Sequence, residues 1–257
     1  MAVARQDTRR RGALAVTPLL SVEAVSKHFR GLLAVDRVSF TVAPGDILAV
    51  IGPNGAGKTT LFNMIAGMLG PDDGTIAFGG ERIDGLAPDA VCRRGIGRTF
   101  QLVRPFAALS VEDNVIVGAL LRRPDVASAR RHALAVLERL DLLDKRTQRA
   151  SALTLPDRKR LEVARALATD PKLLLLDEVM AGLRPTETDR MVAILSALNR
   201  DSGLTIVLIE HVMRAVMALA RRVVVLHHGA AIAEGLPAAI VRDPAVIQSY
   251  LGAEAIA

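Results

Sequence analysis

The chain has 257 residues, a formal net charge of +6, and a composition that is 51% hydrophobic and only 3% aromatic. This length can bury a substantial core, either as one large α/β domain or as a core with one subdomain. The single cysteine, Cys92, rules out a disulfide within the chain, and no uncharged run reaches 18 residues, which excludes a membrane-spanning helix. Because the first residues lack the apolar segment of a signal peptide, we expect the protein in a reducing cytoplasm.

The first 19 residues are basic and show no periodicity, so we expect a flexible tail over residues 1–19. Short β-type runs at 21–25, 34–35 and 38–42 then predict a small antiparallel sheet. Phe29 lies among these runs, where an adenine ring could stack on it. A lone aromatic side chain is equally typical of a core, so both interpretations stay open.

An apolar run at 47–51 is followed by a glycine-rich loop and then by an amphipathic stretch that begins at Lys58. Glycine lets backbone N–H groups crowd around a phosphate chain, while the start of a helix and the Lys58 ammonium add positive charge. Thr59 offers a hydroxyl to Mg²⁺. A strand before the loop and a helix after it favour a nucleotide site over a structural turn. The predicted binding residues are Gly52, Pro53, Asn54, Gly55, Ala56, Gly57, Lys58, Thr59 and Thr60.

Helical spacing after the loop predicts a helix that continues to Leu69. Its apolar face would consist of Leu61, Phe62, Ile65, Met68 and Leu69. A strand at 75–78 and a helix near 89–94 follow. Gln101 comes after a strand-like run and could point its amide at a metal ion or a water, although such a glutamine means little by itself.

Residues 103–160 change to mostly helical sequence and predict an inserted helical subdomain. Ser110 and Asp113 have the spacing of a capping box, as do Thr154 and Asp157. Pro156 suits the first turn of a helix, which we expect to run from there to residue 168.

The apolar run at 173–176 ends in Asp177 and Glu178, the pattern of a buried central strand of a parallel sheet. Ligands bind at this end of such strands, so Asp177 would hold Mg²⁺ and Glu178 would accept a proton from the attacking water. His211 directly follows a further strand at 204–210 and could contact a γ-phosphate. A closing hairpin is predicted around His227 and His228, which we interpret as turn residues.

These motifs, in this order, resemble the ATP-binding subunits of ATP-binding-cassette (ABC) transporters over residues 20–252. The residues within these motifs are most similar to those of the first of the two ATPases in branched-chain amino acid importers. The segments that carry this narrower resemblance are GIGRTFQ at 95–101, DEVMAGL at 177–183 and the stretches 104–114 and 243–252.

The resemblance implies an α/β fold of the P-loop NTPase class, with a RecA-like core whose sheet is mainly parallel. An N-terminal antiparallel β subdomain and an inserted helical subdomain would complete it. The expected organisation is a tail (1–19), two parts of the ATP-binding core (20–102 and 161–236), the helical subdomain (103–160) and a helical extension (237–257).

By the same resemblance, Phe29 stacks on adenine, Gln101 senses Mg²⁺ and Glu178 is the catalytic base of an ATPase. The implied cofactors are ATP and Mg²⁺. The implied partners are a second ATPase subunit or a second copy, two membrane permeases and, through them, an extracytoplasmic solute-binding protein. The chain would therefore lie on the inner face of the cell membrane.

One motif departs from the family pattern. The signature is usually LSGGQ, and here Leu153, Thr154, Leu155, Pro156 and Asp157 stand in its place. In such dimers the signature of one subunit donates to the nucleotide of the other. Pro156 has no N–H to donate, and Asp157 would add negative charge near an anion. Our hypothesis is that the two nucleotide sites are unequal, and that Thr154 serves the weaker one. We cannot assign a role to Arg184, where the family more often has Asp or Asn.

Basic residues gather in the middle of the chain, over 122–160. Such a patch can attract nucleic acid, and a cassette ATPase acting on nucleic acid or ribosomes is the alternative function. A solvated helical face explains the same charges. Because ATPases of that class usually carry a second cassette or long coiled-coil insertions, which are absent from this sequence, we expect no nucleic-acid partner.

Overall fold

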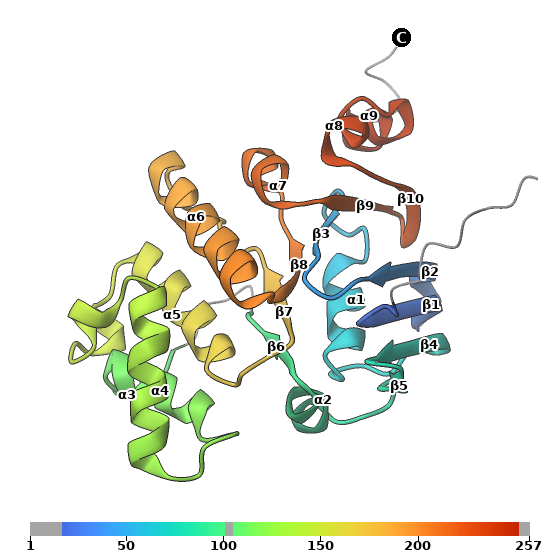
Figure 1. Ribbon diagram of the computed structural model, residues 1–257. Helices are drawn as coiled ribbons and strands as arrows, with labels where there is room; N and C mark the ends of the chain where they lie inside the picture. The colour runs from blue at the N-terminus through green and yellow to red at the C-terminus, as the bar shows by residue number, and fades with distance from the viewer. Residues whose placement is uncertain (1–16, 101–104, 252–257) are drawn as a thin grey trace, which may run out of the picture.

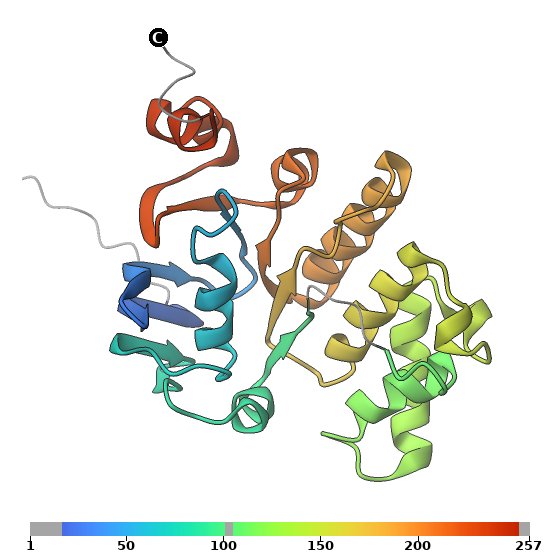
Figure 2. The ribbon, with the colours of Figure 1, turned by 180° about the vertical axis from the view of Figure 1, so that it is seen from behind.

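The structure is a computed structural model that describes residues 17–100 and 105–251. Two β-sheets lie side by side with a helix between them, and further helices cover the far side of the larger sheet (Figure 1, and from behind in Figure 2). Gln101, most of the predicted tail and the last residues of the extension lie outside the described residues.

The larger sheet has six strands in the order β10, β9, β3, β8, β7, β6. The strands from β9 to β6 run parallel, and the edge strand β10 is antiparallel to β9. Their bounds are β3 Ile47–Ile51, β6 Ile96–Arg98, β7 Leu173–Asp177, β8 Thr205–Ile209, β9 Arg222–His227 and β10 Ala230–Gly235. The apolar run at 173–176 therefore forms a central parallel strand, as predicted, and the strand predicted at 47–51 lies in the parallel part of the same sheet.

Both faces of the larger sheet are buried, and alternate residues of one strand enter different cores. In β3, Leu48 and Val50 pack in the core between the two sheets. Ile47, Ala49 and Ile51 pack in the other core, under the helices. This burial on both faces explains why the strand is apolar at every position.

The smaller sheet is antiparallel and has the order β2, β1, β4, β5. Its strands are β1 Leu20–Phe29, β2 Leu32–Val42, β4 Asp73–Phe78 and β5 Glu81–Arg82. The antiparallel sheet predicted before the phosphate loop is thus confirmed, with longer strands and with two members that come after the loop.

Helix α1 lies between the two sheets, while α3, α4 and α5 form a group beside β6 and β7 (Figures 1 and 2). The helices are α1 Lys58–Ile65, α2 Pro88–Arg94, α3 Val111–Ala119, α4 Val126–Arg139, α5 Leu155–Leu167, α6 Pro185–Ser202, α7 Met213–Leu219, α8 Pro237–Ile240 and α9 Pro244–Leu251. Two short 3-10 helices, η1 Leu143–Lys145 and η2 Ala150–Ala152, connect α4 to α5. Over the described ranges, no helix is both long and apolar enough to cross a bilayer.

Local sequence signals explain two helix starts, and the structure corrects a third expectation. Ser110 caps α3 by accepting a hydrogen bond from the Asp113 N–H, and Pro156 lies in the first turn of α5. Helix α1, however, ends at Ile65 instead of continuing to Leu69. Gly67 adopts a left-handed φ of 74°, which stops the helix, and Met68 is half exposed instead of lying on a buried face.

We expect Gly118→Ala to destabilise the packing of α3 against α5. A Cβ atom at Gly118 would lie 2.5 Å from the backbone oxygen of Arg165, so the two helices must separate. Overpacking of this kind costs about 1–3 kcal/mol, to be measured by chemical denaturation. Val117→Ala is the control on the same helix, because Val117 is exposed and its truncation should change the free energy of unfolding by less than ~0.5 kcal/mol. Equal stability of the two variants would contradict the prediction.

Candidate functional site

The phosphate loop joins the end of β3 to the start of α1, as the sequence predicts. Gly52 and Gly57 have φ values of 147° and 96°. A Cβ atom would lie 2.1 Å from the Leu226 oxygen at Gly52 and 2.3 Å from the Ala34 oxygen at Gly57. Only glycine fits at these two positions, because backbone from other strands passes directly against the loop.

The Lys58 ammonium folds back into the loop. Its Nζ donates to the backbone oxygens of Gly52, at 2.7 Å, and of Pro53, at 2.8 Å. Burial lowers the pKa of Lys58, and the negative charges of Glu178 and Asp177 oppose this shift. The loop therefore holds a cation that is already directed toward the place where phosphate oxygens would lie.

Asp177 ends β7 as a buried carboxylate. Its Oδ2 atom accepts a hydrogen bond from Arg98 Nη2 at 3.2 Å, and its backbone N–H donates to Thr99 Oγ1 at 3.0 Å. Its Oδ1 atom is buried and has no hydrogen-bond partner. Burial raises the pKa of Asp177, and the adjacent Arg98 charge opposes that shift. One oxygen of this carboxylate is thus held, and the other is buried without a hydrogen-bond partner.

Glu178 has a left-handed backbone, with φ at 50°. Two contacts hold this conformation: the Glu178 N–H donates to the Ile209 oxygen at 2.9 Å, and Lys159 Nζ donates to the Glu178 oxygen at 2.9 Å. Its Oε1 atom lies 3.9 Å from His211 Nδ1. A left-handed conformation is costly for a residue other than glycine, and these two contacts with the Glu178 backbone stabilise it.

Glu210, the residue before His211, supports the loop after Glu178. Its Oε1 atom accepts a hydrogen bond from the Met180 N–H at 2.9 Å, while Oε2 is buried without a partner. Burial raises the pKa of Glu210 to about 7, and the nearby Glu178 charge adds to the shift.

A cavity of about 460 Å³ lies over the phosphate loop. It is lined by Phe29, Leu32, Leu33, Ala34, Asn54, Gly55, Ala56, Gly57, Lys58, Thr59, Thr60, Glu178 and His228. The structure thus brings Phe29, most of the phosphate loop and Glu178 to one space.

The remaining predicted residues lie elsewhere. The cavity lining does not include Gly52, Pro53, Asp177, His211 or Thr154. Gly52 and Pro53 face Lys58 through their carbonyl oxygens, and Gln101 falls outside the described residues.

Sequence reasoning missed His228, Arg98 and Lys159. His228 follows β9, which pairs in parallel with β3, so the hairpin turn lies beside the start of the phosphate loop. This pairing joins strands far apart in the chain and left no local signal. Arg98 did leave one, because a charged residue in the GIGRTFQ segment enters a strand that is otherwise buried.

The altered signature lies at the start of α5, and its chemistry differs from the expectation. Thr154 occupies the N-cap position of the helix, but its hydroxyl makes no capping hydrogen bond and instead donates to Asp157 Oδ2 at 2.8 Å. Asp157 is 3% exposed and pairs with Lys145, at 2.6 Å, and with Arg160. Burial opposes ionisation of Asp157, but the hydrogen bonds from Lys145, Thr154 and Arg160 together lower its pKa. The expectation that Asp157 repels an anion is therefore wrong, because two cations neutralise its charge.

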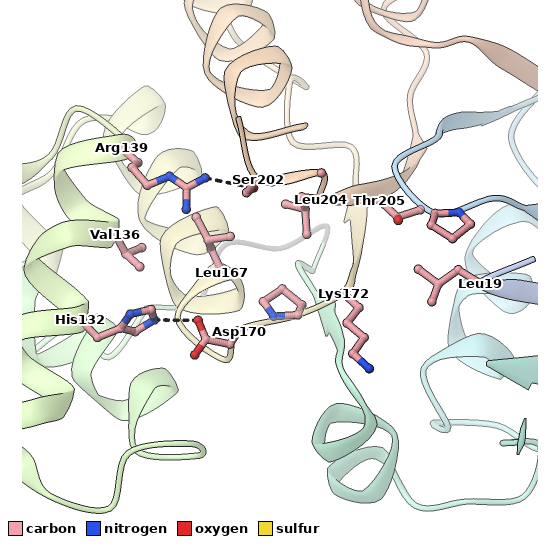
Figure 3. Close-up of a pocket in the computed structure, with 13 residues that line it drawn as sticks. Leu19, His132, Val136, Arg139, Leu167, Asp170, Lys172, Ser202, Leu204 and Thr205 are labelled. Carbon is pink, nitrogen blue, oxygen red and sulfur yellow. Dashed lines mark hydrogen bonds and ion pairs between the residues drawn. The ribbon is translucent and has the colours of Figure 1, made fainter. Parts of the chain in front are cut away.

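A further cavity of about 400 Å³ opens at the opposite ends of the strands, where β7 and β8 begin (Figure 3). His132 Nε2 lies 3.2 Å from Asp170 Oδ1, and Arg139 donates to the Ser202 hydroxyl at 3.2 Å. Burial lowers the pKa of His132. These contacts join α4 to the loop before β7 and to the end of α6, and none of the predicted site residues lines this cavity.

Comparisons with known proteins agree with this geometry. The chain matches the family described as ABC transporter over residues 35–181, and the family described as branched-chain amino acid ATP-binding cassette transporter over residues 232–256. It is 40% identical over 250 residues to the high-affinity branched-chain amino acid transport ATP-binding protein LivG of Escherichia coli, covering 91% of this chain and 98% of that protein. It is 37% identical over 235 residues to the lipopolysaccharide export system ATP-binding protein LptB of Escherichia coli, covering 91% of this chain and 97% of that protein.

Solved structures show the same fold. A nucleotide-free ATP-binding cassette from an ABC transporter superposes with a TM-score of 0.85 at 30% identity, covering 92% of this chain and 100% of that one. The ADP conformation of MJ1267, an ATP-binding cassette of an ABC transporter, gives a TM-score of 0.84 at 30% identity, with coverage of 92% and 99%.

We expect Glu210→Gln to make the protein more stable at pH 8 than the unchanged chain. The folded state binds the Glu210 proton more tightly than the unfolded chain does. The contribution of Glu210 to stability is therefore largest below its ordinary pKa of 4.5 and is lost as the pH rises to about 7. Glutamine imitates the protonated carboxyl, so the variant should gain about 2–3 kcal/mol at pH 8 and nothing at pH 4.5. Denaturant unfolding at several pH values measures this.

Glu138→Gln is the matched control, because Glu138 is an exposed residue of α4. It should leave the pH dependence of unfolding as it is. A Glu210→Gln curve parallel to that of the unchanged chain between pH 4.5 and pH 8 would contradict the prediction.

Proposed function

The chain belongs to the ABC transporter family, as an ATP-binding subunit of the kind that powers transport by hydrolysing ATP. From this premise we propose a role for each residue of the site. ATP binds in the cavity over the phosphate loop, and Glu178 activates the attacking water. The observation that carries this proposal is that Glu178 and the phosphate loop line the same cavity. Phe29, partly exposed at its rim, stacks on the adenine.

We propose Thr59 and Asp177 as the protein groups that hold Mg²⁺ at this site, with Gln101 as a third. Mg²⁺ is usually bound through one or two protein oxygens together with phosphate and water. The buried Asp177 Oδ1 atom without a partner and the Thr59 hydroxyl at the cavity fit such a group. When bound, Mg²⁺ supplies positive charge to the β- and γ-phosphates.

The chain's own residues carry the other steps of the proposed reaction. Lys58 moves from the carbonyl oxygens of Gly52 and Pro53 to phosphate oxygens, exchanging neutral acceptors for charged ones. Glu178 accepts the proton of the water that attacks the γ-phosphate. His211, whose Nδ1 atom lies 3.9 Å from Glu178, contacts the γ-phosphate.

We propose branched-chain amino acids or related solutes as the transported class. The names of LivG and of BraF from Pseudomonas aeruginosa, 38% identical over 250 residues, support this. LptB is nearly as similar but is named for lipopolysaccharide export, so identity alone does not decide between the classes. The match over residues 232–256 favours the amino acid importers.

The proposed assembly pairs this chain with a second ATPase subunit, or a second copy, under two membrane permeases served by an extracytoplasmic binding protein. The chain would lie on the cytoplasmic face of the membrane through the permeases. The transport function named for the relatives supports this arrangement.

Four basic residues of the middle segment have acidic partners within the chain, which argues against nucleic acid as their ligand. Arg130 pairs with Glu112, and Arg123 pairs with Asp170. Lys145 and Arg160 surround Asp157. These four charges neutralise acidic groups of the fold.

We propose that the two nucleotide sites of the assembled pair are unequal. The site on this chain has its phosphate loop, Asp177 and Glu178. The site on the partner depends on the signature at the start of α5, where Pro156 lacks an N–H and the Thr154 hydroxyl donates to Asp157. Fewer donors would face the partner's γ-phosphate, so that site would bind ATP and turn it over slowly.

Glu178→Gln should remove most of the ATPase activity of the assembled complex, by a factor of ~100 or more, because this chain's own site does most of the hydrolysis. The matching substitution in the partner ATPase should leave most of the activity. Steady-state phosphate release from the two complexes measures this. Comparable residual activity from both variants would contradict unequal sites.

Lys58→Ala should abolish uptake of leucine, isoleucine and valine by cells that depend on this transporter, because the phosphate loop loses its cation. Uptake of radiolabelled amino acids measures the loss, and a second copy of the unchanged gene should restore it. Uptake of lysine is the control and should not change. Unaltered uptake of all three branched-chain amino acids would contradict the proposed solute class.

A further inference from the structure

Arg98 is a charged side chain buried beside the proposed metal site. It ends β6, and its side chain is only 8% exposed. Burial lowers its pKa, against the nearby charge of Asp177. Burying a cation costs free energy unless the cation is paired and hydrogen-bonded, so the contacts of Arg98 indicate its role.

The guanidinium of Arg98 is held from several directions. Its Nη1 atom donates to Asn63 Oδ1 of α1 at 2.7 Å. Its central carbon lies 5.9 Å from the centre of the Phe62 ring and 5.3 Å from that of the Phe100 ring. A planar guanidinium restrained in this way has little freedom to turn.

Arg98 also contacts Asp177. Its Nη2 atom donates to Oδ2 at 3.2 Å, which leaves Oδ1 as the oxygen without a partner. Two other cations act on the same carboxylate through space, Lys58 and Lys159. Without Arg98, the carboxylate would be free to turn toward these ammonium groups, which would compete with a metal ion for it.

We propose that Arg98 is a positioning residue for Mg²⁺: by holding Oδ2 of Asp177, it keeps Oδ1 available to the metal. The inference rests on the proposed role of Asp177 as a metal-binding residue. Partners that fix the orientation of a metal-binding carboxylate typically change metal affinity by about 10–100-fold when they are removed. Arg98 itself touches neither the nucleotide nor the metal in this account.

The test measures binding of a fluorescent ADP analogue to the full chain, with Mg²⁺ titrated in and with EDTA present. Arg98→Gln should weaken Mg²⁺ binding in the presence of the nucleotide about tenfold or more. Affinity for the analogue in EDTA should stay within about twofold, because the phosphate loop is intact. Arg98→Lys should behave similarly, since a single ammonium cannot contact Asn63 and Asp177 with the same geometry.

Arg82→Gln is the matched control, because Arg82 is 68% exposed in its side chain and pairs with Asp84 on the surface. It should change neither quantity. Asp177→Asn separates the inference from its premise. If Asp177→Asn leaves the Mg²⁺ dependence unchanged, the proposed metal site itself is wrong. If Asp177→Asn abolishes it and both Arg98 variants keep it, only the positioning role is overturned.

Two further outcomes are informative. An equal loss of affinity with Mg²⁺ and with EDTA would mean that Arg98 only supports the fold, which overturns the proposal. If Arg98→Gln fails to fold, Asn63→Ala provides the test, because it removes an anchor of Arg98 and keeps the pair with Asp177. It should weaken Mg²⁺ binding in the same direction by a smaller factor, and an unchanged Mg²⁺ affinity for both Asn63→Ala and Arg98→Lys would overturn the proposal.

Discussion

The phosphate loop is fixed by close approaches between backbone segments, and the rest of the site depends on them. Gly52 lies against the Leu226 oxygen at the end of β9, and Gly57 lies against the Ala34 oxygen in β2. Because no Cβ atom fits at either position, the loop is tied to the larger sheet and to the smaller sheet at once. The cavity can therefore form only when both sheets are assembled, although their strands lie far apart in the chain.

Around the loop, the cationic side chains already donate hydrogen bonds, whereas one carboxylate oxygen has no donor. Lys58 and Lys159 donate to backbone oxygens, and Arg98 donates to Asn63 and Asp177. Asp177 nevertheless keeps one buried oxygen without a partner. A neutral carbonyl is a weaker acceptor than a phosphate oxygen, which supports the proposed exchange of partners by Lys58, and the carboxylate oxygen without a partner supports the proposed metal site.

Sequence patterns predicted the parts of the fold that depend on short stretches of chain. The apolar strand before Lys58 and the strand that ends at Asp177 are examples, because burial on both faces leaves a continuous apolar run. The predicted length of α1 was wrong. The left-handed backbone of Gly67 ends the helix, although Met68 has helical spacing. His228 was missed because its place beside the phosphate loop comes from the pairing of β9 with β3, two distant segments, which no local pattern encodes. Arg98 was missed although a charged residue in a short buried strand is a local signal, because its contact with Asp177 depends on the pairing of β6 with β7.

The signature at the start of α5 shows how ion pairs that appear only in the structure change the expected effect of a residue. From sequence, Asp157 suggests repulsion of an anion, but Lys145 and Arg160 neutralise it. The Thr154 hydroxyl donates to Asp157, yet a rotation would free it at the cost of one hydrogen bond to a charged acceptor, roughly 1.5–3 kcal/mol. The N–H that Pro156 lacks cannot be recovered by any motion. The lasting defect is therefore a missing donor at the helix start, which fits a site that turns over slowly better than one that does not bind.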